Sequence, residues 1–161
     1  MIAQDKAFFL KSIDLLRTWK KDQEPQWGSM SPQHMVEHLV GSWRISNGRA
    51  QAPQMLTNED VEVRREFLFS EKAYAKNIAN PTSKTQGNAP LRKESLNAAI
   101  DQLQDEMKAF FEYHKSHVDA IEMHPVFGPL NFEGWMTSQT KHITHHMMQF
   151  GLLRQFLIYE A

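Results

Sequence analysis

The sequence contains no cysteine, and this absence removes several kinds of chemistry at once. A chain without cysteine has no disulfide bond, no thiolate metal ligand and no cysteine nucleophile. Its 18 Lys and Arg residues nearly balance its 19 Asp and Glu residues, so the formal net charge is −1. Such a balance leaves no electrostatic footprint for nucleic acid or for an anionic membrane surface. The lack of cysteine also fits a reducing, cytoplasmic location.

Long apolar runs are missing as well. No run approaches the roughly 20 apolar residues that span a bilayer. Charged residues interrupt the first segment, MIAQDKAFFLKSIDLL, so it does not predict a signal peptide. The sequence also lacks GxSxG, P-loop, GxGxxG and HExxH patterns. These absences predict a soluble protein that binds neither membrane nor nucleic acid.

The composition that remains is typical of a globular protein. The chain has 161 residues, of which 41% are hydrophobic and 23% are charged. This length is enough for one domain with its own hydrophobic core. We therefore expect a single domain over residues 1–161.

Four long segments show the apolar periodicity of amphipathic helices. Ser31 and Pro32 are start signals for the second, and Asn131 can cap the last. No segment shows sustained alternation of strand-type residues. The pattern predicts an all-α four-helix bundle with a long crossover between the second and third long helices. The long helices are predicted at residues 4–20, 32–46, 93–117 and 132–159, with a short helix at 58–67 in the crossover.

Histidines are concentrated in QTKHITHHMMQF, residues 139–150. His142 and His146 are four residues apart, which places both rings on one face of a helix, where they can bind one divalent ion. They lie beside apolar residues, so we expect them to point into the bundle. Buried imidazoles need polar partners, and a metal ion is one such partner. His145 is rotated by about 100° from His146, beside the site or on the surface.

A third ligand must come from another helix. His38 is the best candidate, because it lies on the apolar face of the second helix. His34 lies one turn earlier and is a more exposed alternative. His114 and His117 extend the apolar stripe of the third long helix, where a hydrogen-bonded role at the end of the bundle is the simpler interpretation. His124 precedes Pro125 in a turn and is a candidate for a pocket rim or for a structural role.

Three neutral imidazoles with an open coordination position are typical of catalytic zinc. Imidazole also suits nickel, copper and iron, so the residue types do not determine the metal. Ligating histidines usually donate their second N–H group to an acceptor. Gln139, Gln149 and Glu37 are candidates for that acceptor.

Two stretches together resemble the DinB-like superfamily, in particular its DUF1569-type branch. WGSMSPQHMVEHL, residues 27–39, is similar to the opening of that branch's second helix. HPVFGPLNFEGWMTSQTKHITHHMMQFGL, residues 124–152, is similar to its fourth-helix region, where an HP-x-FG turn leads to a tryptophan and then to H-x-x-H-H-x-x-Q-F-G. The two stretches cover about a quarter of the chain, and helix order extends the match to most of it.

The resemblance implies an up-down-down-up four-helix bundle that is often dimeric. It also implies a metal site with one histidine from the second helix and two from the fourth, which are His38, His142 and His146 here. Known relatives include thiol-dependent transferases and isomerases that use bacillithiol or mycothiol, and some amide hydrolases. The name of the superfamily refers to induction by DNA damage and not to DNA binding.

We therefore expect a metal-dependent enzyme in which a divalent ion activates water or a low-molecular-weight thiol. Zinc and nickel are the first candidates for this ion. Hydrolase and S-transferase activities both fit, with a small-molecule substrate and a homodimeric assembly. The alternative is a non-catalytic, stress-associated helical protein that binds a metal. In a third interpretation the histidines bind no metal and form hydrogen bonds inside the bundle.

Overall fold

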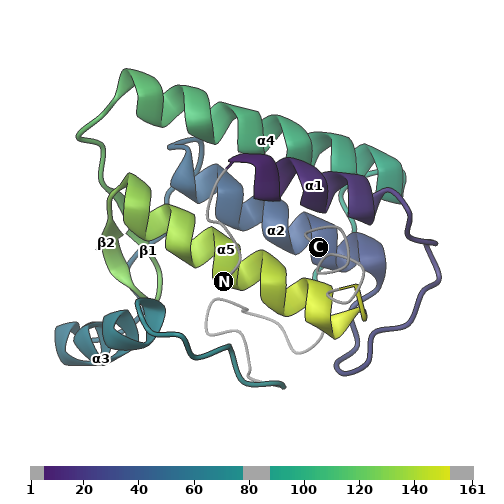
Figure 1. Cartoon of the computed structure of the whole chain (residues 1–161), viewed down its shortest axis with the longest axis horizontal. Helices are drawn as coiled ribbons and strands as arrows, with labels where there is room; N and C mark the ends of the chain where they lie inside the picture. Colours follow the sequence, from purple (N-terminus) through teal and green to yellow (C-terminus); the bar gives the residue numbers. More distant parts are fainter. Residues whose placement is uncertain (1–5, 78–87, 153–161) are drawn as a thin grey trace.

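The structure, a computed structural model, describes residues 6–77 and 88–152. These residues form a mainly helical protein, as the sequence predicts (Figure 1). No helix among them is long and apolar enough to cross a membrane. The elements are α1 (Lys6–Leu16), α2 (Pro32–Ser46), α3 (Asn58–Leu68), α4 (Leu96–Ser116), β1 (Glu122–His124), β2 (Gly128–Leu130) and α5 (Phe132–Gln149).

Four of the helices, α1, α2, α4 and α5, pack around one core, and α2 lies between α4 and α5 (Figure 1). In that view α1 and α5 run from left to right, whereas α2 and α4 run from right to left. The short helix α3 lies apart from them, beside the hairpin formed by β1 and β2. The arrangement leaves α2 and α5 as neighbours, and these are the helices that carry the histidines of interest.

Aromatic rings fill the centre of this core. Trp43 of α2 is fully buried and meets Phe9 of α1 and Phe110 of α4, with ring centroids 4.8 Å and 5.2 Å away. Both contacts are edge-to-face, an arrangement that aromatic pairs favour. One side chain therefore joins three helices.

Local start and stop signals place α2 as predicted. The Ser31 hydroxyl accepts a hydrogen bond from the backbone N–H of His34, at 3.2 Å, and Pro32 occupies the first helical position. Asn47 is the C-cap. In α3 the N-cap is Thr57, and the helix ends one residue later than predicted. The predicted start of α4 at residue 93 is wrong, because Ser95 caps the helix and Leu96 begins it.

The prediction that the last helix continues to residue 159 is wrong, because α5 ends at Gln149. The N–H of Gly151 binds the carbonyl of Met148, and the N–H of Leu152 binds the carbonyl of Met147. This pair of bonds is the Schellman motif, and Gly151 has the positive φ of 74° that the motif requires. The rest of the predicted helix, residues 153–159, lies outside the described residues.

The first helix is also shorter than predicted. It ends at Leu16, and a hydrogen-bonded turn from Leu15 to Thr18 follows it. The turn directs Trp19 onto Phe150, with ring centroids 4.8 Å apart. The prediction that the helix reaches residue 20 is therefore wrong, and its predicted start at residue 4 lies outside the described residues.

The β1–β2 hairpin corrects the prediction that the chain contains no strand. Its antiparallel register pairs Glu122 with Leu130 and His124 with Gly128. Each strand has three residues, which is too short to show an alternating pattern in the sequence. The hairpin places His124 at the end of β1, before the turn that leads to β2 and then to α5.

Polar side chains attach the crossover between α2 and α4 to the rest of the protein. Glu37 of α2 is buried and accepts hydrogen bonds from the backbone N–H groups of Arg92 and Lys93, at 2.8 Å and 3.0 Å. Lys141 of α5 donates a hydrogen bond of 2.7 Å to the carbonyl of Ser70. Arg65 of α3 donates to the hairpin carbonyl of Pro129 at 2.8 Å. These bonds bring the segment after α3 against α5, on the side of its histidines.

Candidate metal centre

Three histidines from two helices converge between α2 and α5. His38 lies in the middle of α2, and His142 and His146 lie one turn apart on α5. Their ring centroids are 4.8 Å, 5.1 Å and 4.9 Å apart. One nitrogen from each ring can be chosen so that all three lie within 4.8 Å of one another. This is the only such cluster of three or more His, Asp or Glu side chains among residues 6–77 and 88–152.

A row of polar contacts holds the two helices in this register. The Ser42 hydroxyl, one turn after His38, donates to Oε1 of Gln139 at 3.1 Å. The amide of Gln139 donates to the hydroxyl of Ser46 at 3.2 Å. Since Gln139 is fully buried, its amide must find partners inside the protein, and both serines provide them. Gln139 therefore aligns the helices and does not orient a histidine, contrary to one of the sequence predictions.

A chain of hydrogen bonds determines which nitrogen of His146 faces the centre. Gln149 donates its amide N–H to the carbonyl of Trp27, at 3.0 Å. Its Oε1 therefore points toward Nδ1 of His146, 2.8 Å away. Because an amide oxygen only accepts, Nδ1 of His146 must carry the proton. The lone pair of Nε2 remains available for a metal ion.

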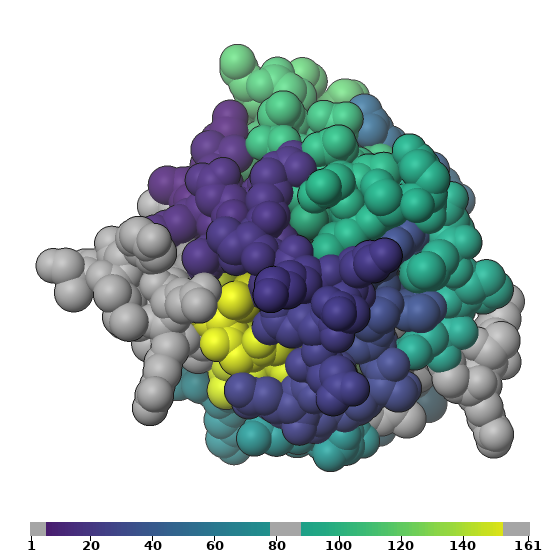
Figure 2. All heavy atoms as spheres, turned by 90° about the vertical axis from the view of Figure 1, so that its right-hand side faces the viewer, coloured from purple at the N-terminus to yellow at the C-terminus, as the bar shows by residue number. Residues whose placement is uncertain are grey.

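The segment before α2 is shaped to hold Gln149 in place. Gly28 has a positive φ of 78°, and a Cβ atom there would lie 2.9 Å from the amide nitrogen of Gln149. The backbone N–H of Gln26 donates to the carbonyl of Gln149 at 2.7 Å. Figure 2 shows the end of α5, in yellow, bordered by the segment that joins α1 to α2. The connection between these helices is therefore part of the site.

The three histidines are neutral at physiological pH. Burial, together with a smaller contribution from a charge on His145, lowers the pKa of His38 to about 4. Burial and a charge on His38 lower the pKa of His146 to about 3, although its bond to Gln149 opposes the shift. The pKa of His142 also lies well below 6.5, through burial and the charges of its neighbours. Burial is the largest cause of these pKa shifts, although His38 and His142 keep part of their surface exposed.

This donor set fits a divalent ion. Nε2 of His38 and Nε2 of His142 share a hydrogen bond of 2.8 Å, so one ring donates a proton that an ion would replace. Nitrogens on one tetrahedral zinc lie about 3.4 Å apart, given Zn–N bonds of about 2.0–2.1 Å. The observed limit of 4.8 Å requires ring movements on the order of 1 Å. Neutral imidazoles are ligands for zinc, nickel, copper and iron.

The other candidate ligands lie outside this cluster. His34 is held by its own helix cap, because its Nδ1 shares a hydrogen bond of 2.7 Å with the Ser31 hydroxyl. His114 is buried and binds the carbonyl of Ser46 through Nε2, at 2.9 Å. Exposed His117 binds the carbonyl of Tyr113 through Nδ1, also at 2.9 Å. His114 and His117 therefore have the hydrogen-bonded role that the sequence favoured.

Glu37 does not orient a ligand either, because it binds the chain before α4. Of the three acceptors considered from the sequence, only Gln149 contacts a histidine of the cluster. The carbonyl of Trp27, which orients Gln149, was not predicted. A backbone carbonyl is present at every residue, so nothing in the sequence distinguishes this one.

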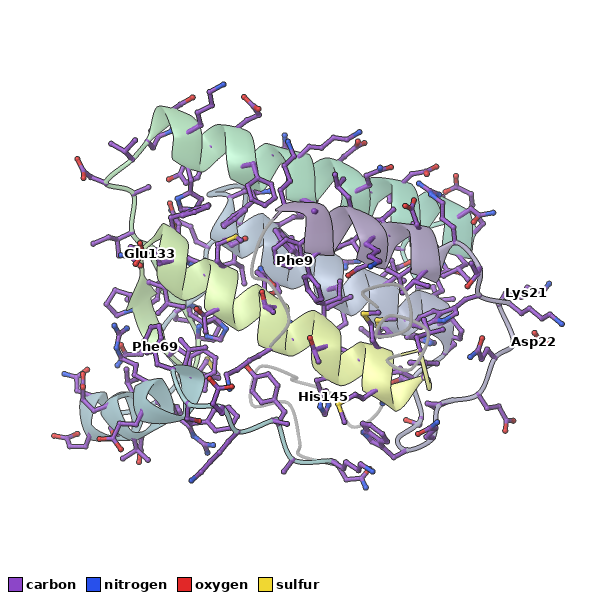
Figure 3. The ribbon with its side chains drawn as sticks, in the orientation of Figure 1. Phe9, Lys21, Asp22, Phe69, Glu133 and His145 are labelled. Carbon is purple, nitrogen blue, oxygen red and sulfur yellow. The ribbon has the colours of Figure 1, made fainter. Side chains whose placement is uncertain are left out.

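His145 lies beside the cluster on the side of the crossover. Its ring contacts those of Trp27 and Tyr74, each with centroids 5.7 Å away, and that of His146 at 5.2 Å. In Figure 3 His145 projects below α5 toward the segment that follows α3. Two aromatic rings from separate parts of the chain therefore form a wall next to the three histidines. The contribution of Tyr74 was not predicted.

Gln149→Ala is expected to weaken metal binding about 10–100-fold while the protein still binds one equivalent. Without Oε1, the ring of His146 is free to rotate, and its Nδ1 proton is no longer held. Competition with a chromogenic chelator measures the dissociation constant. Thr140→Ala is the matched control, since it removes a buried polar side chain of the same helix whose hydroxyl binds the carbonyl of Met136 within α5. Equal losses of affinity in the two variants would contradict the role of Gln149.

Comparison with known proteins does not identify a relative. No protein-family model matches the chain, and no curated protein or solved structure matches it either. The case for a metal centre therefore rests on the three histidines, their neutral state and the bonds that orient them.

Proposed function

We propose that this protein is a metal-dependent enzyme of the DinB-like type. A divalent ion would be held by His38, His142 and His146 and would act on a small electrophilic substrate. Zinc and nickel are the first candidates for this ion. The nucleophile would be water, in a hydrolase, or a low-molecular-weight thiol, in an S-transferase. The observation that carries the proposal is the convergence of three neutral imidazoles from two helices within 4.8 Å.

The chemistry of the donor set supports a catalytic site over a structural one. Structural zinc sites are closed by four protein ligands, whereas catalytic sites use three and keep one position open. Among the described residues, no carboxylate joins the three histidines as a fourth ligand. A bound divalent ion supplies Lewis-acid activation of water or of a thiol near neutral pH.

The residues of this chain would divide the remaining work. The lowered pKa values keep the three rings unprotonated, so that their lone pairs are available at neutral pH. Gln149 holds the ring of His146 in one orientation. The rings of Trp27 and Tyr74 would shield one side of the site from water, which strengthens electrostatic interactions inside it.

The proposal extends to the architecture and the assembly. We include an up-down-down-up four-helix bundle made by α1, α2, α4 and α5. The opposite directions of α1 and α5 relative to α2 and α4 support it (Figure 1). A homodimer is part of the proposal because the resemblance to DinB-like proteins implies one.

One observation favours a non-catalytic metal site instead. Two surface hollows, of about 380 Å³ and 350 Å³, are lined by residues other than the three histidines. The first is lined by residues of α3 and the hairpin, and the second by the segment between α1 and α2. A metal site whose histidines line neither hollow would suit a metal-binding protein that performs no reaction.

Metal analysis by mass spectrometry tests the proposal, on untagged protein purified without chelators or nickel resin. We expect close to one equivalent of a divalent metal. In the cobalt(II) form, added azide should change the visible spectrum, because an open position accepts a further ligand. Thiol-transfer and hydrolase assays would follow. A protein that takes up no metal contradicts the proposal. A protein that binds one equivalent of cobalt(II), but whose visible spectrum does not change when azide is added, favours the non-catalytic site.

A further inference from the structure

His124 has no role in the account above, because it neither binds the proposed metal ion nor orients a residue that does. It ends β1, and its ring packs on Phe127 and Trp135, with centroids 4.5 Å and 5.0 Å away. Its Nδ1 accepts hydrogen bonds from the backbone N–H groups of Val126 and Phe127, at 3.1 Å and 3.2 Å. The ring therefore closes the turn of the hairpin through one of its two nitrogens.

These bonds determine the tautomer. A nitrogen that accepts two N–H groups carries no proton, so the neutral ring must be protonated at Nε2. Burial lowers the pKa of His124 to about 3, which keeps the ring neutral at physiological pH. Among the described residues Nε2–H has no acceptor, while the ring keeps part of its surface exposed. The turn thus presents a fixed and unused hydrogen-bond donor.

The ring of His124 rests on the same face of α5 that carries the metal ligands. Trp135, on which the ring of His124 rests, precedes His142 by seven residues, which is two helical turns and about 10 Å. This contact places His124 within about two helical turns of His142 along α5. It is not part of the cluster whose nitrogens lie within 4.8 Å. His124 is therefore too far from the other three histidines to bind the same ion, but it can contact a bound molecule that extends from the centre.

We propose that Nε2–H of His124 binds an acceptor oxygen of the substrate held at the three-histidine centre. The proposal rests on the proposed function and adds to it a substrate class. The substrate is a small molecule with a carbonyl or carboxylate oxygen several ångströms from the atom that lies at the metal. A donor fixed by two backbone N–H groups gives this oxygen one position, and so orients the reacting end.

The variant that tests this is His124→Asn. The side-chain oxygen of asparagine lies near the position of Nδ1, so it can still accept from the backbone of the turn. It has no group at the position of Nε2–H, so the donor is lost. His124→Gln is the counterpart, because its amide reaches the position of Nε2 and can restore a donor there.

The probes are acetate, malonate, succinate and glutarate, added to the cobalt(II) form and followed by visible absorption. Acetate can occupy the metal but offers no second carboxylate. We expect the wild-type protein to bind one of the dicarboxylates at least about tenfold more tightly than acetate, as one hydrogen bond to a charged group allows. His124→Asn should lose this preference and bind acetate unchanged, and His124→Gln should recover part of it.

Nitrogen-15 NMR of the metal-free protein tests the donor separately, and we expect the Nε2–H tautomer for His124. An Nδ1–H tautomer would overturn the inference, whether or not the protein binds a metal ion. If cobalt binds but His124→Asn keeps the dicarboxylate preference, or the wild type shows none, the inference fails and the proposed function stands. If the wild-type protein binds no metal at all, both fail together.

Discussion

His142→Ala is expected to abolish stoichiometric metal binding while the helical circular dichroism signal largely persists. His142 supplies one of only three ligands, and its Nε2 lies 2.8 Å from Nε2 of His38. Two imidazoles on separate helices would remain, which cannot enclose an ion. Alanine has the highest helix propensity, so α5 should still form. Metal content after dialysis, measured by mass spectrometry, gives the result.

His145→Ala is the matched control for this experiment. It removes a neighbouring histidine of α5 whose ring contacts Trp27, Tyr74 and His146 but does not belong to the cluster. This variant should keep close to one equivalent of metal. A dialysed His142→Ala protein that still holds one equivalent of metal would show that the ligand assignment is wrong.

Trp43→Ala should produce the largest loss of stability of any single substitution discussed here, about 3–5 kcal/mol of the free energy of unfolding. The side chain is 0% exposed and joins α1, α2 and α4 through Phe9 and Phe110. A domain of this size has about 5–15 kcal/mol in total, so the midpoint of thermal unfolding should fall by about 6–20 °C. Calorimetry and urea denaturation measure the two quantities.

Trp43→Phe separates packing from hydrogen bonding at this position. The indole nitrogen of Trp43 is buried and has no hydrogen-bond partner among the described residues, so its loss removes no bond. Phenylalanine keeps a ring between Phe9 and Phe110, and the cost should be less than half that of alanine. A Trp43→Ala protein as stable as the wild type would contradict the central place of this residue in the core.

The helix starts show how much local sequence decides. Ser31-Pro32, Thr57 and Asn131 each place a side-chain oxygen or a fixed φ where a helix begins, and all three helices start there. The end of α5 was missed although Gly151 signalled it. The sequence prediction followed the apolar stripe beyond Gly151. In the structure, the two hydrogen bonds of the Schellman motif end the helix.

The hairpin could not be predicted in this way. Its strands have three residues each, and its turn depends on contacts between segments that are distant in sequence. Gly128 has a φ of 71°, and a Cβ atom there would lie 2.9 Å from a methyl group of Val61 in α3. Neither these contacts between distant segments nor the closeness of Val61 to Gly128 can be predicted from residues 124–130 alone.

The sequence by itself determined the mainly helical class and the helix faces that carry His38, His142 and His146, because both follow from spacing along a helix of 3.6 residues per turn. Only the tertiary structure decided what surrounds them. It selected Gln149 over Gln139 and Glu37 as the partner of a site histidine, through the carbonyl of Trp27. It also left Nε2–H of His124 without an acceptor among the described residues. Helical spacing says which way a side chain points, but its hydrogen-bond partners come from other segments, whose positions depend on how the whole chain packs.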